Sequence, residues 1–134
     1  MKRALFALPL LLTAASAPAL SENWRATGST GGAVGYVDTD SVKRQGDEVR
    51  FWTEIRYSEP QSLPAGKLFD RMAALVEIDC RAKTYRSVRI RANLGGRLVH
   101  QGKIPNDRPD PVRPGTNIDA QMRAVCLGDW ASGG

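Results

Sequence analysis

The histidine content of this sequence limits the catalytic chemistry that it can support. His100 is the only histidine among 134 residues. Catalytic triads, histidine metal clusters and histidine-based acid–base pairs therefore cannot be assembled in their usual forms. A single histidine within a strand pattern is more often a surface or packing residue. We predict no catalytic residue and no enzymatic activity.

One acidic motif has the spacing with which a calcium loop begins. Asp38-Thr39-Asp40 matches the first positions of such a loop. The later ligand and glycine positions do not match, because they are occupied by Val42, Lys43 and Val49. A turn is the better interpretation, since aspartate and threonine side chains bond to nearby backbone groups.

A second acidic pattern could act as a carboxylate pair. Glu77 and Asp79 stand two residues apart on the same face of a predicted strand. Paired carboxylates can perform hydrolysis. Three basic neighbours favour ion pairing across the sheet face instead: Arg81, Arg86 and Arg89. We predict no metal ligands, no cofactor-binding residues and no cofactor.

Basic and aromatic side chains form a candidate binding face. Arg89 and Arg91 share a predicted strand face with Tyr85 and could form a cationic strip for anionic polymers. Three residues would extend this strip if their strand neighbours the first: Arg50, Trp52 and Arg56. The alternative, which we prefer, is a solvated sheet face whose guanidinium groups pair with acidic side chains: Glu54, Glu77 and Asp79.

Residues 1–19 have the organisation of a secretory signal peptide. Lys2 and Arg3 precede an apolar run, and small residues follow it, so we expect cleavage after Ala19 or, as the less favoured site, after Ala17. The apolar run is too short to span a bilayer core of about 30 Å. We therefore expect an exported protein of a Gram-negative envelope with no membrane span, located in the periplasm, at the cell surface or outside the cell.

The remaining residues, 20–134, suit one domain. Removal of Lys2 and Arg3 with the signal peptide leaves 17 basic and 14 acidic side chains, a net charge of +3. Nucleic-acid-binding domains are usually more basic than this. We predict no nucleic-acid partner.

Cys80 and Cys126 are the two cysteines of the chain. An even number of cysteines in an oxidising compartment favours a disulfide. This bond would close a loop of about 47 residues and stabilise the domain by roughly 4 kcal/mol. The alternatives are a metal site, which needs more ligands, and a redox pair, which usually has C-x-x-C spacing. We predict a structural disulfide.

Alternation of apolar and polar residues predicts most of the strands. The clearest is 48–58, where Val49 and Phe51 fall on one face and Arg50 and Trp52 on the other. Turn-forming residues predict loops at 28–32, 59–66 and 105–115, and 67–72 is ambiguous between helix and strand. The further strands are expected at 22–26, 33–37, 74–80, 84–94 and 97–104.

A short C-terminal helix is expected over 116–126. Thr116 is a credible N-cap, and Asp119 can accept hydrogen bonds from backbone N–H groups near the helix start. One helical face is apolar: Ile118, Met122, Val125 and Cys126. The predicted fold class is α+β, mostly β, with an antiparallel sheet of about five to six strands and the short helix held against it by the disulfide.

Several short motifs follow one another in a fixed order. Trp24 is followed by Tyr36-Val37-Asp38, then by residues 41–46, Val49 and Trp52. Later come Glu77-Ile78-Asp79-Cys80 with Tyr85-Arg86, and Pro114-Gly115-Thr116 before Cys126. In order and spacing, this sequence resembles the surface-adhesin protein E family of exported bacterial proteins over about residues 24–126. The resemblance implies an antiparallel sheet packed with a C-terminal helix, a Cys80–Cys126 disulfide and no enzymatic activity.

Two functional hypotheses follow. Because the name-giving members of that family are adhesins for host extracellular-matrix proteins, the resemblance implies a non-enzymatic exported binding module with a protein partner, such as a matrix protein. The sequence does not specify this partner, and it does not decide whether the protein forms a homodimer. The alternative is a periplasmic inhibitor of a secreted or host enzyme such as lysozyme. Its inserting loop would be Asp107-Arg108-Pro109-Asp110.

Overall fold

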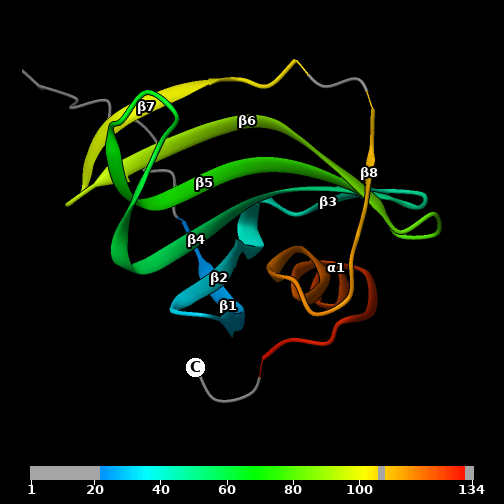
Figure 1. Ribbon diagram of the computed structural model, residues 1–134. Coiled ribbons are helices and arrows are strands. Elements are labelled where there is room, and N and C mark those ends of the chain that lie inside the picture. The colour runs from blue at the N-terminus through cyan, green and yellow to red at the C-terminus, as the bar shows by residue number, and fades with distance from the viewer. Residues whose placement is uncertain (1–21, 106–107, 132–134) are drawn as a thin grey trace, which may run out of the picture.

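An antiparallel sheet with one helix packed on one of its faces makes up the described chain, residues 22–105 and 108–131, in the computed structural model (Figure 1). Six strands follow in the order β1-β2-β4-β5-β6-β7, and the short strands β3 and β8 pair with β4 and β6. This confirms the predicted antiparallel sheet with a C-terminal helix. The elements are β1 (Trp24–Thr30), β2 (Ala33–Asp38), η1 (Thr39–Ser41), β3 (Lys43–Gln45), β4 (Glu48–Ser62), β5 (Leu68–Asp79), β6 (Thr84–Leu94), β7 (Arg97–Lys103), β8 (Asp110–Pro111) and α1 (Asn117–Leu127).

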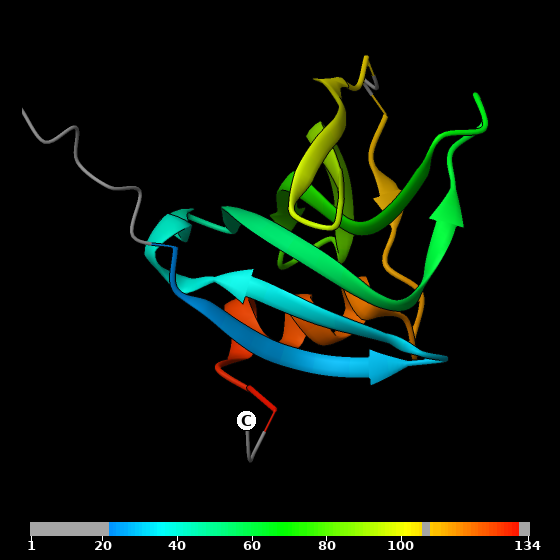
Figure 2. The same ribbon diagram turned by 90° about the vertical axis from the view of Figure 1, so that its left-hand side faces the viewer.

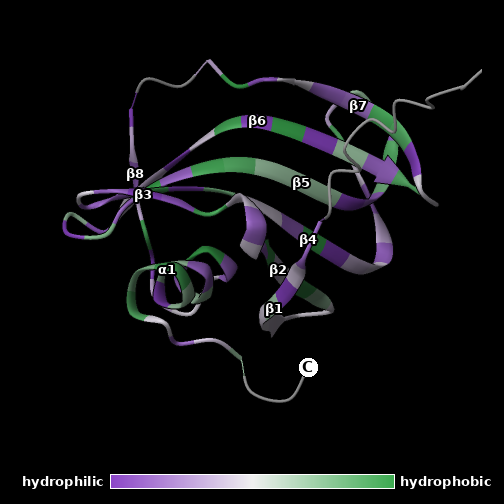
Figure 3. Cartoon of the chain, turned by 180° about the vertical axis from the view of Figure 1, so that it is seen from behind, coloured by the Kyte–Doolittle hydropathy of each residue, from purple (hydrophilic) through white to green (hydrophobic). Residues whose placement is uncertain are grey.

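Side-chain alternation divides the sheet into two faces. Phe51 of β4 is paired with Val76 of β5, so both side chains lie on the face that α1 covers. We call this face the inner face and the opposite one the outer face. Figure 3 shows the alternation as purple and green bands along β4 and β6. The buried core lies between the inner face and α1 and consists of Val37, Val49, Phe51, Val76, Ile78 and Met122.

Helix α1 begins at the expected N-cap and ends at a glycine cap that was not predicted from the sequence. The Thr116 side chain accepts a hydrogen bond from the Asp119 amide at 3.2 Å, and the Asp119 carboxylate accepts one from the Gly115 amide at 3.1 Å. Gly128 ends the helix in the left-handed conformation, with a φ of 71° that a side chain would disfavour. The predicted helix and its Thr116 N-cap are therefore confirmed. In the described residues no helix has the length and hydrophobicity needed to cross a membrane.

Two glycines of the sheet face α1, and at Gly35 the absence of a side chain allows a close approach. A Cβ atom on Gly28 would lie 3.4 Å from Cβ of Ala120, and one on Gly35 would lie 3.2 Å from Nε2 of Gln121. Figure 2 shows α1 lying along β1 and β2, where these glycines are found. Gln121 is only 1% exposed, although the apolar stripe predicted for the helix did not include it.

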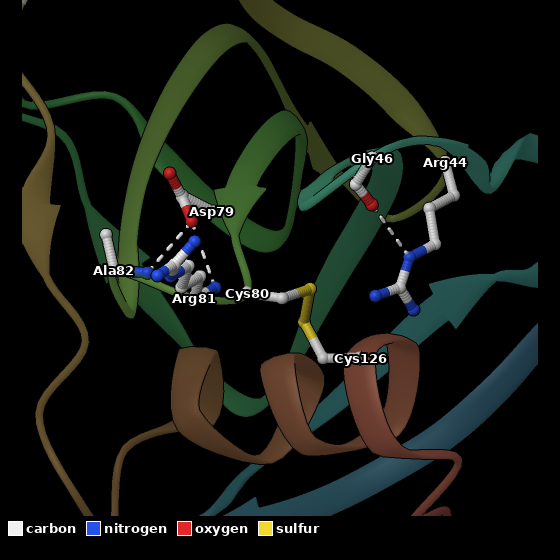
Figure 4. Close-up of a disulfide and its surroundings, with 7 residues drawn as sticks. All are labelled: Arg44, Gly46, Asp79, Cys80, Arg81, Ala82 and Cys126. Carbon is white, nitrogen blue, oxygen red and sulfur yellow. Dashed lines mark hydrogen bonds between the residues drawn. A yellow bond between two sulfur atoms is a disulfide. The ribbon is translucent and has the colours of Figure 1, made fainter.

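The Cys80–Cys126 disulfide joins the end of β5 to α1 (Figure 4). Its Cα atoms are 5.8 Å apart, and 46 positions separate the two cysteines in the sequence. The turn beside it is ordered by Asp79, whose carboxylate accepts hydrogen bonds from the amides of Arg81 and Ala82, both at 2.9 Å (Figure 4). The predicted disulfide is confirmed, and it fastens the helix to the β5–β6 turn.

Three strand boundaries differ from the predictions. Gly28–Thr30 continues β1 beyond a bulge after Ala26, where the sequence predicted a turn, because Thr27 is buried and donates its hydroxyl to the Gly35 carbonyl at 3.2 Å. Residues 59–62 continue β4, where a loop was predicted. Pro60 is tolerated there because it falls in an irregular stretch between two paired segments. The ambiguous segment 67–72 is strand from Leu68 onward.

Candidate functional site

The outer face carries a row of basic and aromatic side chains across four strands. Register pairs Trp52 of β4 with Leu75 of β5, Leu75 with Arg89 of β6, and Arg89 with Lys103 of β7. Paired residues of antiparallel strands point to the same face. Trp52, Arg89 and Lys103 therefore lie on the outer face, away from α1.

A neighbouring row brings Arg91 onto the indole ring of Trp52. Arg91 is paired with Ala73 of β5, and its guanidinium carbon lies 4.4 Å from the centre of the Trp52 ring. The strands of these two residues are not neighbours, because β5 lies between them. The small side chain of Ala73 leaves space for the arginine to reach across. This cation–π contact fixes the position of the guanidinium over the ring.

These rows enclose a shallow depression of about 440 Å³. We call this depression the basic hollow. Arg89 and Lys103 are exposed at its surface, whereas Trp52 and Arg91 are partly buried. The residues lining it are Trp52, Arg89, Ile90, Arg91, Gln101, Gly102 and Lys103.

The cations of the basic hollow have no carboxylate partners in the part of the chain that the structure describes. None of the ion pairs found there includes Arg89, Arg91 or Lys103. The Nε atom of Arg91 is buried and has no hydrogen-bond partner among residues 22–105 and 108–131. An anionic group placed here would therefore meet cations that are not already neutralised.

Two other arginines of the candidate face are ion-paired, as the solvated-face interpretation predicts. Arg50 lies 3.6 Å from the Glu77 carboxylate, which Arg86 also binds at 2.8 Å. Arg56 binds the Glu54 carboxylate at 2.7 Å. Asp79 is not part of this pairing, because its carboxylate is occupied by the turn beside Cys80.

Glu54 is the most buried carboxylate of the outer face. Its side chain is 9% exposed, and the guanidinium of Arg71, the residue paired with Arg56, lies 3.7 Å from the same carboxylate oxygen that Arg56 contacts. Arg56 also stacks on the Tyr36 ring, with its guanidinium carbon 4.0 Å from the ring centre. This cluster is satisfied within the protein and therefore offers less free charge than the basic hollow.

Tyr85 does not lie beside the arginines with which the sequence grouped it. Leu75 is paired with Arg89 but Val76 is paired with Ser87, so Val88 is an extra residue in β6. This bulge reverses the alternation between the two ends of the strand. Tyr85 is consequently on the inner face and packs against the core, and its grouping with the outer-face arginines is wrong.

The predicted binding face did not include Ile90 or the three β7 residues of the hollow, of which Gln101 and Lys103 contribute polar side chains. The Gly95-Gly96 turn indicated that β6 and β7 form a hairpin. The pairing of Gln101 with Arg91, however, depends on an irregularity in which Val99 is the extra residue of β7. The alternation of 97–104 alone could not reveal this.

The loop considered for enzyme inhibition is only partly described. Asp107 lies outside the described residues. Asp110 belongs to β8 and is paired with Tyr85 of β6. This end of the loop is therefore attached to the sheet.

The chain was compared with known proteins. The family model described as surface-adhesin protein E matches residues 24–127. No curated protein matches the chain. Among solved structures, the chain is similar to Haemophilus influenzae protein E, with a TM-score of 0.47 and 15% sequence identity, over 83% of this chain and 97% of that chain.

Proposed function

We propose, because this chain belongs to the surface-adhesin protein E family, that it is an exported, non-enzymatic protein that binds a protein partner through the basic hollow. The partner class that the family suggests is a host extracellular-matrix protein. Export to the periplasm or cell surface is inferred from the predicted signal peptide and from the family. The observation that carries the choice of surface is the set of cations beside Trp52 that form no ion pair within residues 22–105 and 108–131.

The residue types in the basic hollow are those that commonly dominate binding energy. Tryptophan and arginine are enriched among interface residues whose truncation is most costly. Arg91 is already held over Trp52, so less side-chain freedom is lost when a partner binds. Arg89 and Lys103 are exposed and free of carboxylates among the described residues, and they would attract an acidic partner surface.

The acidic residues near the hollow support a binding role over a catalytic one. Glu54 and Glu77 are each held by two arginines, so both carboxylates are engaged in ion pairs within the protein. His100, the single histidine, lies on β7 with an exposed side chain. Among the residues that the structure describes, no three histidine, cysteine, aspartate or glutamate side chains gather as a metal ligand set would.

A binding assay with substituted proteins tests this proposal. The purified mature protein is applied to immobilised extracellular-matrix extract, alongside Trp52→Ala and Arg89→Glu/Lys103→Glu proteins. Arg97→Glu is the matched control, because it reverses a charge at the other end of β7, outside the hollow. Thermal melting establishes that each variant is folded.

We expect both hollow variants to lose binding by about tenfold or more and the control to retain it. Binding of the unsubstituted protein should also weaken with salt, because the exposed cations are screened. Unchanged binding by both hollow variants would refute the proposed surface. Absence of binding by the unsubstituted protein would refute the matrix-protein proposal.

A further inference from the structure

Strand β7 forms an open edge beside the basic hollow. It is the last strand in the order β1-β2-β4-β5-β6-β7, and no described strand pairs with the edge of β7 that is turned away from β6. The Ile104 amide donates a hydrogen bond to the Val88 carbonyl of β6 at 2.9 Å. Main-chain groups of antiparallel strands alternate in direction. Those of Gly102 therefore also point toward β6, and those of Gln101 and Lys103 point away from it, toward the open edge.

The residues whose main-chain groups point toward the open edge are the same ones whose side chains reach the hollow. Gln101 and Lys103 are paired with Arg91 and Arg89, so their side chains lie on the outer face. An extended peptide bonded to the main chain of Gln101 and Lys103 would be in register with them. Its alternate side chains would point to the outer face as well.

The positive charge of this end of the sheet favours an acidic peptide. Strands β6 and β7 contain no aspartate or glutamate, and their basic residues are Arg86, Arg89, Arg91, Arg97 and Lys103. Arg86 is bound by Glu77, whereas the cations of the hollow have no such partner in the described chain. If the bound peptide carried acidic side chains at every second position, these side chains would lie beside the cations of the hollow.

We propose that an extended acidic segment of the partner adds to β7 as a further strand, with Asp or Glu at alternate positions beside the basic hollow. This inference rests on the proposed function and specifies the partner chemistry at the same surface. Main-chain bonds to Gln101 and Lys103 supply register, and Arg89, Arg91 and Lys103 supply selectivity. Strand addition to an open sheet edge is a general mode of peptide recognition.

A second copy of this chain fits the edge less well than an acidic segment does. Pairing of β7 with β7 of another copy would bring Lys103 and its neighbouring arginines toward the same cations. Like charges that face each other across strands are destabilising. At the other end of β7, the Lys67 ammonium donates a hydrogen bond to the Val99 carbonyl at 3.4 Å, which brings a further cation to this strand.

Synthetic peptides test the inference. The first has about eight residues, an ordinary strand length, with Glu at every second position and Thr or Val between. The second has the same composition with its Glu residues grouped together. The third repeats the first with N-methylated main-chain nitrogens, which cannot donate hydrogen bonds. A sulfated oligosaccharide serves as a polyanion without a peptide backbone. Each is titrated into the mature protein, and fluorescence anisotropy is measured.

We expect the alternating peptide to bind at least about tenfold more tightly than the grouped and N-methylated peptides. Arg89→Glu/Lys103→Glu should reduce its affinity by about tenfold or more, and Arg97→Glu should leave it nearly unchanged. Equal affinity of the alternating and N-methylated peptides would overturn strand addition. So would equal affinity of the grouped peptide, or binding of the oligosaccharide in place of the alternating peptide.

The outcomes separate this inference from the proposed function. If the hollow variants lose matrix binding but none of the peptides binds, strand addition is wrong and the binding surface stands. If the hollow variants keep matrix binding, the proposed surface is wrong whatever the peptides do. Binding of the alternating peptide with the expected order of affinities supports both.

Discussion

Removal of the Cys80–Cys126 disulfide should destabilise the domain strongly without abolishing its fold. The bond links positions 46 apart in the sequence, and the chain-entropy model assigns a cross-link over such a loop about 4 kcal/mol. The measured loss should fall within about 2–5 kcal/mol, the range for native disulfides of small exported domains. For a domain of this size, 4 kcal/mol corresponds to a decrease in Tm of about 15 °C.

The contacts that remain explain why the fold should persist. The Cys80 amide donates to the Asp47 carbonyl at 2.8 Å, and this bond holds the end of β5 without the sulfur. Met122 would still be buried in the core, and α1 would still pack on Gly28 and Gly35. The β5–β6 turn and α1 would be released from each other. Helix 117–127 should therefore become the first protease-sensitive segment.

A denaturation experiment measures this effect. The Cys80→Ala/Cys126→Ala protein, which has no free thiol, is compared with the oxidised protein in urea, and both are then treated with trypsin. We expect a lower midpoint and earlier cleavage at Arg123. A difference in unfolding free energy below about 1 kcal/mol would refute the argument that the disulfide is a main stabilising element. First cleavage in β6 or β7 would refute the assignment of the effect to α1.

Three further substitutions test separate parts of the account. Gly35→Ala should reduce the free energy of unfolding by about 1–3 kcal/mol, since the new Cβ would lie 3.2 Å from both Gln121 Nε2 and Thr27 Oγ1. Gly102→Ala, which has open space around it, is the control and should change this free energy little. Equal effects of the two substitutions in urea denaturation would contradict the close helix approach. Glu54→Gln should reduce the free energy of unfolding by about 1–3 kcal/mol, because it removes the charge that Arg56 and Arg71 share. The control is Glu48→Gln at an exposed position, and equal urea midpoints of the two variants would contradict this. Burial raises the pKa of the Tyr57 hydroxyl above 10.0. The contribution of this hydroxyl to stability is therefore complete below about pH 10 and is lost as pH rises through the raised pKa. Tyr57→Phe should reduce the alkaline loss of stability, and identical pH profiles of the two proteins would contradict this.

The layers of the fold were predictable because they depend on local patterns. Alternation placed Val49 and Phe51 on a different face from Trp52 in β4, and the structure retains that division. Thr116 carried a local N-cap signal, and its side chain bonds the Asp119 amide as expected. Such features depend on neighbours within a few residues, so one sequence is sufficient to predict them.

The composition of the basic hollow was only partly predictable because it depends on pairing between distant strands. Trp52 and Arg91 were both candidates, but their contact requires the order β4-β5-β6 and a small residue, Ala73, between them. The extra residue Val88 moves Tyr85 to the opposite face. Bulges are set by the partner strand as well as by the strand itself, and no local pattern in 84–94 marks this one.

The central claim is that the outer-face basic hollow is the surface that binds a partner. Amide hydrogen exchange of the mature protein, alone and bound to the extracellular-matrix extract, tests it most directly because it reports on every strand at once. We predict that bound protein gains protection around Trp52, at 89–91 and at 101–103. Protection confined to α1, β1 and β2, with none at the hollow, would contradict the claim.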